Sequence, residues 1–209
     1  MFDQAITKDA KSTLAILGKA GILPPKTYLA GGTALAIQLG HRISYDLDFF
    51  TNENFDRQAI LPKLGQLQFS LEREDKGTIL GKINETKFSL FYYPYPLISE
   101  TLNYQDIQLA GIQDIAAMKV DAISGRGKRR DFIDLYYISK HISLSDALEL
   151  YDKKYKKLST NKFHILKSLD YFVDADAESE SEVLIEDYSW SKVKKFFQEE
   201  TIKIARELS

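Results

Sequence analysis

The sequence of 209 residues contains no cysteine and only three histidines, His41, His141 and His164, which lie far apart. The absence of cysteine excludes disulfide bonds and thiolate metal sites, and the scattered histidines do not suggest a zinc cluster. A bound metal would therefore be a hard cation with oxygen ligands. The chain also lacks a membrane-spanning run of roughly 18 to 20 apolar residues and a signal-peptide pattern at its start. We therefore expect a cytoplasmic protein with no membrane partner.

Neither sign of charge dominates, because 28 Lys and Arg residues balance 30 Asp and Glu residues and the net charge is -2. A chain with this balance has no overall basic field, so cations that bind nucleic acid would have to cluster locally. The content of hydrophobic residues is 44% and that of aromatic residues is 12%. This composition allows a sizeable core and excludes global disorder.

The first hundred residues mix two hydrophobic periods, which predicts an α+β fold around a small sheet. Helices are expected at 9–20, 33–39 and 55–64, and strands at 28–30, 44–50, 67–74, 78–83 and 87–93. The dipeptides Lys76-Gly77 and Asn84-Glu85 are typical hairpin turns between the last three strands.

The rest of the chain carries helical periods, apart from a short strand expected at 107–110. Helices are expected at 112–123, 131–141, 144–151, 162–172 and 189–208. The acidic segment 174–187 has no helical pattern and is interpreted as a solvated connector. We therefore place a domain boundary near residue 100, with a helical region at 101–209 packed on the first domain at 1–100, because no flexible spacer separates them.

Two aspartates in the strand expected at 44–50 are the first candidate site. Side chains alternate along a strand, so Asp46 and Asp48 point to one face while Leu47 and Phe49 face the core. Two neighbouring carboxylates repel each other unless a cation lies between them. Divalent Mg²⁺ prefers such oxygen ligands together with phosphate oxygens. The alternative is an edge strand that carries two ordinary surface aspartates.

The Gly31-Gly32-Thr33 turn precedes these aspartates and connects a strand to a helix. Backbone N–H groups and the positive end of a helix dipole favour phosphate at such a turn, and Thr33 adds a hydroxyl group. A lone Gly-Gly turn is often only a turn. The order of strand, glycine turn, helix and Asp-x-Asp strand, however, lets a phosphate site and two metal-binding carboxylates meet at one end of adjacent strands.

This arrangement resembles the signature of the DNA-polymerase-β-like nucleotidyltransferases. Four ordered blocks, spread over most of the chain, resemble more narrowly the AbiEii/AbiGii toxin family of bacterial nucleotidyltransferases, the toxin half of type IV toxin–antitoxin systems. The blocks are "GGTALAIQLGHRISYDLDFF", "GTILGKINETKFSLFYYPYPL", "DIAAMKVDAISGRGKRRDFIDLYYI" and the pair "YFVDADAE" and "YSWSKVKKFF".

The resemblance implies a polymerase-β-like palm, formed by a small mixed sheet flanked by helices, followed by a helical C-terminal region. It implies transfer of a nucleotide from an NTP with Mg²⁺ or Mn²⁺, and a separately encoded antitoxin partner. The acceptor that it implies is RNA, in particular tRNA.

The third block supplies the second group of candidates. Lys119 lies among apolar residues of a helix, and Arg126 belongs to the basic cluster that follows. Such cations suit a triphosphate or an RNA backbone, while the alternative is a solvated basic loop. Asp131 and Asp134 are three apart and share a helix face. The family pattern places Lys119 and Asp131 at the active site, where Asp131 would activate the acceptor hydroxyl or orient Lys119.

One position departs from the polymerase-β-like pattern, which commonly has a third metal-binding carboxylate on a later strand. The strand that aligns with it carries Ser89, which cannot replace a charged ligand. Either Asp131 or Asp134 completes the metal site, or the protein binds a nucleotide without turnover. His41 and Arg42 precede the aspartates and are candidate cations for the triphosphate, or else a loop pair that contacts solvent or the aspartates.

A phosphatase of the haloacid-dehalogenase type also begins from Asp-x-Asp on a strand. That motif requires Thr or Val two residues after the second Asp, where this chain has Phe50. The sequence therefore favours a nucleotidyltransferase, and the competing hypothesis is a nucleotide-binding regulatory or interaction protein of the same fold.

Overall fold

The structure is a computed structural model that describes residues 1–156, 162–179 and 182–207. The chain divides into two compact units, a sheet unit (Met1–Gly111) and a helical unit (Ile112–Ser209). The sheet unit extends beyond the boundary expected near residue 100, because strands β6 (Leu102–Tyr104) and β7 (Ile107–Leu109) pair with the sheet. The expected packing of the helical region on the palm stays a prediction.

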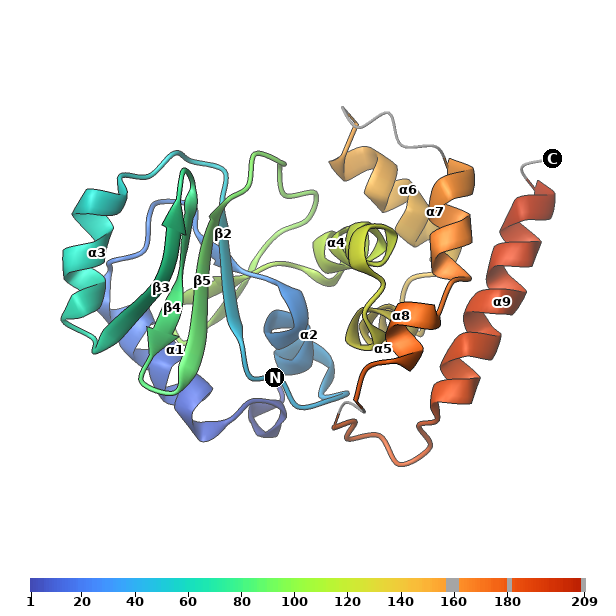
Figure 1. The fold of residues 1–209 in the computed structure, drawn as a ribbon, viewed down its shortest axis with the longest axis horizontal. Coiled ribbons are helices and arrows are strands. Elements are labelled where there is room, and N and C mark those ends of the chain that lie inside the picture. The colour runs from blue at the N-terminus through green and yellow to red at the C-terminus, as the bar shows by residue number, and fades with distance from the viewer. Residues whose placement is uncertain (157–161, 180–181, 208–209) are drawn as a thin grey trace. The chain divides into compact units, whose positions relative to one another are not determined.

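Within the described ranges, the sheet unit contains one mixed sheet of seven strands in the order β3-β4-β5-β2-β1-β7-β6 (Figure 1). Its other strands are β1 (Tyr28–Leu29), β2 (Leu47–Thr51), β3 (Phe69–Asp75), β4 (Thr78–Ile83) and β5 (Thr86–Tyr92). β2 runs parallel to β5, and β1 runs parallel to β7. The remaining neighbours are antiparallel, with turns at the two predicted hairpin positions. The α+β class predicted from the sequence is confirmed.

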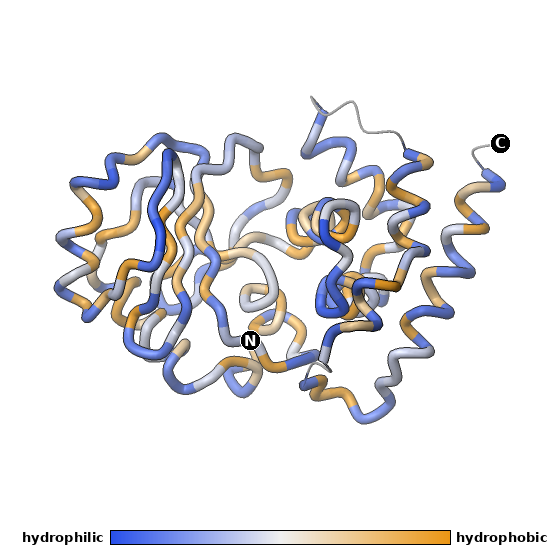
Figure 2. Tube along the Cα trace, in the orientation of Figure 1, coloured by the Kyte–Doolittle hydropathy of each residue, from blue (hydrophilic) through white to orange (hydrophobic). Residues whose placement is uncertain are grey.

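The two faces of the central strands differ in burial. Leu47 and Phe49 of β2 are fully buried, whereas Asp48 and Phe50 on the opposite face are half-buried. The outer strand β3 is hydrophilic along much of its length (Figure 2), which suits an edge strand because charged side chains disfavour pairing with another chain. The face of Asp48 is therefore the face on which a polar site can form.

Four helical segments accompany the sheet: η1 (Asp3–Ala5), α1 (Lys8–Ala20), α2 (Gly31–Leu39) and α3 (Arg57–Gly65). α1 begins after Thr7, whose hydroxyl accepts a hydrogen bond from the Ala10 N–H, and ends at Gly21 in the left-handed conformation. The Thr13 hydroxyl donates to the Thr86 hydroxyl, which places α1 on the buried face of β5. The opposite face is thereby left to the polar residues of β2.

The helical unit contains α4 (Ile112–Arg126), α5 (Arg129–Ile138), α6 (Leu144–Lys154), α7 (Lys162–Leu169), α8 (Val173–Asp176) and α9 (Trp190–Glu207). α4 contacts α5, α6 and α7, and α9 contacts α5 and α7. The ring of Phe132 is fully buried and packs against Phe172, Trp190 and Phe197. None of the helices in the described ranges combines the length and apolar character that crossing a membrane requires.

The acidic segment differs from the solvated connector that its composition predicts. It begins within α8, and Asp176 accepts hydrogen bonds from the indole N–H of Trp190 and from Lys194. Glu178 accepts a hydrogen bond of 2.9 Å from the Arg129 backbone N–H. Because these carboxylates bind groups of α5 and α9, the described part of this segment is anchored to the helical unit. Residues 180 and 181 of the prediction lie outside the described residues.

Candidate active site

The glycine turn forms the first turn of α2, which begins two residues earlier than the sequence pattern indicates. Gly31 has a φ of 66°, a conformation that glycine adopts without the strain of a side chain. The helix follows Ala30, whose methyl side chain cannot accept hydrogen bonds from the first-turn N–H groups. The N-terminus of α2 therefore has the features of a phosphate-binding site.

Asp48 lies directly beside this turn. The Ala30 N–H donates a 3.0 Å hydrogen bond to the Asp48 backbone carbonyl, because β1 and β2 pair in antiparallel orientation. A Cβ atom on Gly31 would lie 3.4 Å from the Oδ2 atom of Asp48. The structure thus brings the glycine turn and the Asp48 carboxylate together, as the order of the motifs predicts.

Asp46 immediately precedes β2 and is half-buried, like Asp48. The Thr33 hydroxyl donates a hydrogen bond to the Asp46 backbone carbonyl and can accept one from the Ser44 hydroxyl, whose oxygen lies 2.8 Å away. Only 1% of the surface of Thr33 is exposed. Its hydroxyl therefore fixes the loop that presents Asp46. Ser44 was not singled out in the sequence, because an isolated serine in a loop carries no recognisable pattern.

Arg42 is buried against the same turn. A Cβ atom on Gly32 would lie 2.2 Å from the Nη2 atom of Arg42, and the Nη1 atom donates a 2.9 Å hydrogen bond to the Ile43 carbonyl. The guanidinium thus adds a full positive charge next to the positive end of α2. His41 is also buried, with 1% of its surface exposed, so the pair does not form the solvated loop that the sequence left open.

The acidic pair fits a divalent cation by its donor chemistry, since carboxylate oxygens are the ligands that Mg²⁺ and Mn²⁺ accept. In the parallel register of β2 and β5, Asp48 is directly opposite Ser89. The alignment of Ser89 with the third carboxylate of the polymerase-β-like pattern stays a prediction. Within the described part of the chain, no three His, Cys, Asp or Glu side chains form a group suited to a metal. The ligands available to a cation here are therefore the two carboxylates together with oxygen atoms of the substrate and of water.

The helical unit carries a second charged cluster, formed by Lys119 and Arg126 of α4 with Asp131 and Asp134 of α5. The Lys119 ammonium lies 2.8 Å from Asp131 Oδ1 and 2.6 Å from Asp134 Oδ2. Arg126 donates to both oxygens of Asp131, at 2.8 Å from Nε and 3.1 Å from Nη2. The sequence grouped these four residues correctly, because Asp131 and Asp134 share the face of α5 that meets α4.

Exposure separates the roles of these residues. Both carboxylates are fully buried and Lys119 is 4% exposed, whereas 49% of the Arg126 side chain is exposed. Burial alone would raise the pKa of Asp131, but the charge of Lys119 and the hydrogen bond from Arg126 together hold that pKa below its ordinary value. A buried carboxylate with a lowered pKa is a weak general base, so the geometry favours an orienting role for Asp131.

The neighbouring basic residues are partly structural. The Nε atom of Arg129 donates a 3.0 Å hydrogen bond to the Ala175 carbonyl, and its guanidinium carbon lies 5.1 Å from the centre of the Trp190 ring. Lys128 lies 3.7 Å from Glu178. Sequence alone could not separate these residues from Arg126, because they share one short basic run.

Comparisons with known proteins agree with this architecture. The chain is 41% identical over 180 residues to the uncharacterised protein aq_aa25 of Aquifex aeolicus (strain VF5), covering 82% of this chain and 84% of that protein. MenT4, a nucleotidyltransferase toxin of Mycobacterium tuberculosis, has a similar fold with a TM-score of 0.58 at 16% identity, over 90% of this chain and 81% of MenT4. The structure of JHP933 from Helicobacter pylori matches with a TM-score of 0.50 at 17% identity, over 99% and 97% of the two chains.

These folds identify the sheet unit and the helices that follow it as a polymerase-β-like nucleotidyltransferase architecture. The sequence profile of the family described as "Nucleotidyl transferase AbiEii toxin, Type IV TA system" matches residues 16–95 and 91–206. The chain therefore belongs to the AbiEii family of nucleotidyltransferase toxins of type IV toxin–antitoxin systems.

Proposed function

We propose that this nucleotidyltransferase moves an NMP from an NTP to an RNA acceptor, in particular tRNA, with the help of Mg²⁺ or Mn²⁺. The single observation that carries the proposal is the position of the Asp48 carboxylate, whose Oδ2 atom would lie 3.4 Å from a Cβ atom on Gly31 at the N-terminus of α2. This arrangement brings carboxylate oxygens, which suit a divalent cation, close to a helix end that suits phosphate.

In the sheet unit, Asp46 and Asp48 would hold the cation. When bound, the cation supplies positive charge that neutralises the triphosphate and the leaving pyrophosphate. The backbone N–H groups of Gly31 and Gly32 bind phosphate oxygens, and Arg42 adds its buried charge beside them. Thr33 acts as a positioning residue, because its hydroxyl holds the loop that carries Asp46.

In the helical unit, Arg126 is the cation of the cluster that reaches the surface and can bind a phosphate group. Lys119, Asp131 and Asp134 form the buried support that orients it. The resemblance also assigns Lys119 to nucleotide binding, and its exposed fraction of 4% favours a supporting role instead.

Catalysis would rest mainly on positioning and on charge neutralisation, since nucleotidyl transfer needs an acceptor hydroxyl aligned with the α-phosphate and a stabilised pyrophosphate. Membership of a type IV toxin–antitoxin family implies an antitoxin partner for this chain. We propose that this antitoxin is separately encoded and restrains the same activity.

The experiment that tests the proposal is incubation of the purified protein with each of the four α-labelled NTPs, Mg²⁺ or Mn²⁺, and tRNA. Label should move to RNA with at least one NTP, and chelation of the metal should stop the transfer. If no NTP labels any RNA while the protein remains folded, the proposed reaction is wrong.

The position of Ser89 opposite Asp48 supports one competing function, a nucleotide-binding protein without turnover. That protein would gain thermal stability on binding an NTP but would transfer no label. Its inhibition of growth would also be insensitive to Asp48→Asn, whereas a toxin that acts by nucleotidyl transfer would lose toxicity.

A further inference from the structure

A pocket of about 330 Å³ lies in the helical unit, between the C-terminal end of α4 and one side of α7. Ser124 and Arg126 line it from α4, and His164, Lys167, Ser168 and Tyr171 line it from α7 and the turn that follows. A volume of this order suits a ligand of the size of one nucleotide.

The α7 side of the pocket is a continuous polar stripe. His164, Lys167 and Ser168 follow helical spacing and therefore share one side of the helix axis. Tyr171 lies in the turn after α7 and lines the same pocket. The opposite side of α7 carries the buried residues Ile165, Leu166 and Leu169. The polar stripe thus serves no role in the core, and its residues are available to a ligand.

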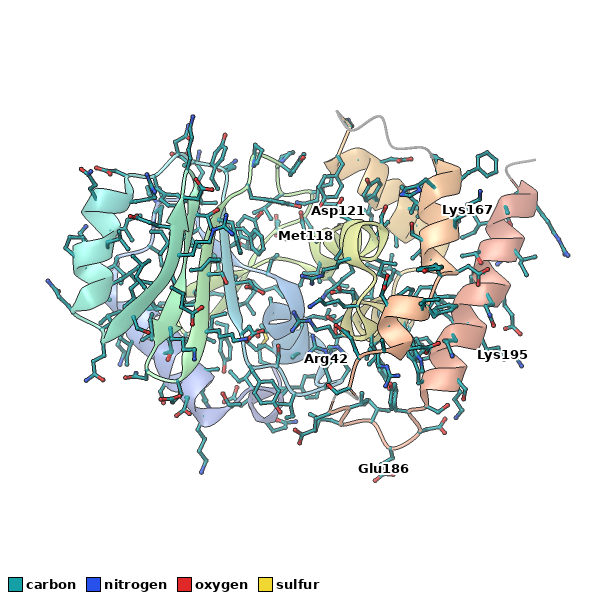
Figure 3. The ribbon with its side chains drawn as sticks, viewed as in Figure 1. Arg42, Met118, Asp121, Lys167, Glu186 and Lys195 are labelled. Atoms are coloured by element: carbon teal, nitrogen blue, oxygen red, sulfur yellow. The ribbon has the colours of Figure 1, made fainter. Side chains whose placement is uncertain are left out.

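The charges of the pocket favour a phosphodiester. Lys167 projects from α7 (Figure 3), and Arg126 is held from behind by the buried Asp131 carboxylate through its Nε and Nη2 atoms. An arginine oriented in this way loses little conformational entropy when it binds a phosphate oxygen. Asp174 also lines the pocket. Its negative charge repels a triphosphate, but its carboxylate oxygens can accept a hydrogen bond from a ribose hydroxyl.

Two further features suit a nucleobase and its backbone. The side chain of Tyr171 is aromatic and 54% of its surface is exposed, and bases of single-stranded RNA commonly stack on such rings. Gly125 also lines the pocket, and a Cβ atom there would meet no described atom within 4 Å. Packing within the protein therefore does not require glycine at this position, and the absence of a side chain leaves room for a ligand.

From these observations we propose that the pocket binds one nucleotide of the single-stranded end of the RNA acceptor. Its phosphate lies at Arg126 and Lys167, its base stacks on Tyr171, and its 2′-hydroxyl donates to Asp174. The inference rests on the proposed function for the identity of the acceptor, and it assigns residues of acceptor recognition within the helical unit.

The test measures RNA binding directly, so that it does not depend on turnover. Fluorescence anisotropy gives the Kd of the full-length protein for a labelled tRNA transcript and for a short single-stranded RNA. Lys167→Glu and Tyr171→Ala should each weaken RNA binding about tenfold or more. The first variant loses the contact with phosphate and the second loses the stacking of the base. Lys195→Glu is the matched control, because Lys195 lies on α9 (Figure 3), its side chain is 74% exposed and it does not line the pocket.

Equal RNA affinity of Lys167→Glu and Lys195→Glu would overturn the inference, as would the absence of RNA binding by the unaltered protein. Melting temperatures of all variants exclude unfolding as the cause of any loss. The NTP-dependent rise in melting temperature should be unchanged in Lys167→Glu, and its loss would contradict a pocket for the acceptor alone. If the protein binds RNA in a way that depends on Lys167 but transfers no label, the proposed function is refuted and the RNA-binding pocket remains supported.

Asp174 gives a second arm of the test. A DNA oligonucleotide of the same sequence lacks the 2′-hydroxyl and should bind more weakly than the RNA. Asp174→Ala should reduce the difference between the affinities for RNA and for DNA. Equal affinities of the unaltered protein for RNA and DNA would show that the pocket does not read the ribose, and would contradict this part of the inference.

Discussion

The two glycines of the turn are required for different physical reasons. Gly31 adopts a positive φ and lies against Asp48, whereas Gly32 leaves room for the guanidinium of Arg42. The first requirement concerns the backbone conformation, and the second concerns a neighbouring charge. The sequence predicts a phosphate-binding turn from these residues, but the approach of Arg42 depends on the path of the loop between α2 and β2, for which no periodic pattern exists.

Gly32→Ala should displace Arg42 rather than unfold the protein, because the atom that a new Cβ would meet is the end of a flexible side chain. We expect NTP affinity to fall about tenfold or more through loss of a charged hydrogen bond to phosphate, with a small change in melting temperature. The effect should largely vanish in an Arg42→Ala background, since the two changes remove one interaction. Gly65→Ala is the control, because a Cβ there meets nothing within 4 Å. Additive losses of NTP affinity in the Gly32→Ala, Arg42→Ala double variant would contradict the idea that Gly32 acts by leaving room for Arg42.

Asp131 should contribute stability in a pH-dependent way. Its pKa in the folded protein is lowered from 3.8: burial opposes this, but Lys119 and Arg126 outweigh burial. The ionised carboxylate therefore stabilises the fold above its unfolded pKa, and this contribution is lost as the pH falls through the lower folded value. Urea denaturation at neutral and acid pH should show Asp131→Asn destabilised relative to the unaltered protein at neutral pH, with a smaller difference at acid pH. A difference that does not change with pH would contradict this account.

Strand register determines which side chains face Asp48. Because β2 and β5 are parallel with Asp48 opposite Ser89, Ser89→Asp places a third carboxylate beside the acidic pair. Repulsion should lower the melting temperature in the presence of a chelator, and added Mg²⁺ should raise it by more than in the unaltered protein. Ser70→Asp is the control, because Ser70 is exposed on the outer strand β3, which β4 and β5 separate from β2. An equal Mg²⁺ response in the unaltered protein and in Ser89→Asp would argue against a cation at Asp46 and Asp48.

The packing of α4 on α6 includes an ion pair with no exposed surface. The Nζ atom of Lys154 lies 2.7 Å from the Oδ1 atom of Asp114, and both side chains are 0% exposed. Asp114→Ala leaves a buried charge and should lower the free energy of unfolding by about 3–5 kcal/mol. The double variant Asp114→Leu with Lys154→Met should recover most of this loss. Urea denaturation measures the free energy of unfolding of both variants. If the double variant is destabilised as much as Asp114→Ala, an unpaired buried charge is not the cause of the loss.

Local patterns account for the elements that the sequence predicts well, and long-range pairing accounts for those it misses. Both hairpins and every long helix follow from periodicity, turn residues and caps, with ends displaced by a few residues. β6 was missed because a three-residue strand is defined by its partner β7 and not by its own composition. α8 was missed because its acidic residues resemble a solvated loop, while Asp176 in fact accepts hydrogen bonds from Trp190 and Lys194.

The candidate site could be predicted from the sequence only in part. Asp46, Asp48 and the glycines stand out because carboxylates and glycines interrupt apolar strands and helices. The burial of Lys119 and the exposure of Arg126 are properties of how α4 packs with α5, so the sequence cannot rank these two cations. The polar stripe of α7 also escaped notice, because a polar helix face is the ordinary face toward solvent.

The molecule as a whole separates its functional groups between two units. The sheet unit carries the acidic pair and the phosphate turn, and the helical unit carries the buried charge cluster and the basic pocket. The nearly balanced total charge of the chain hides this local organisation, because cations are concentrated in the run from Arg126 to Arg130 while carboxylates are concentrated in the segment after α7. Binding of RNA by this protein should consequently weaken as the salt concentration rises, despite its net charge of -2.

We propose above all that Asp46 and Asp48 support nucleotidyl transfer at the glycine turn. The most direct measurement compares transfer of label from an α-labelled NTP to tRNA by Asp46→Asn and by Asp75→Asn, a control whose side chain is 66% exposed on β3. We predict that Asp46→Asn loses transfer by a factor of at least about a hundred, while Asp75→Asn retains it and both variants melt at the same temperature as the unaltered protein. Transfer by Asp46→Asn at the rate of the unaltered protein would contradict the account.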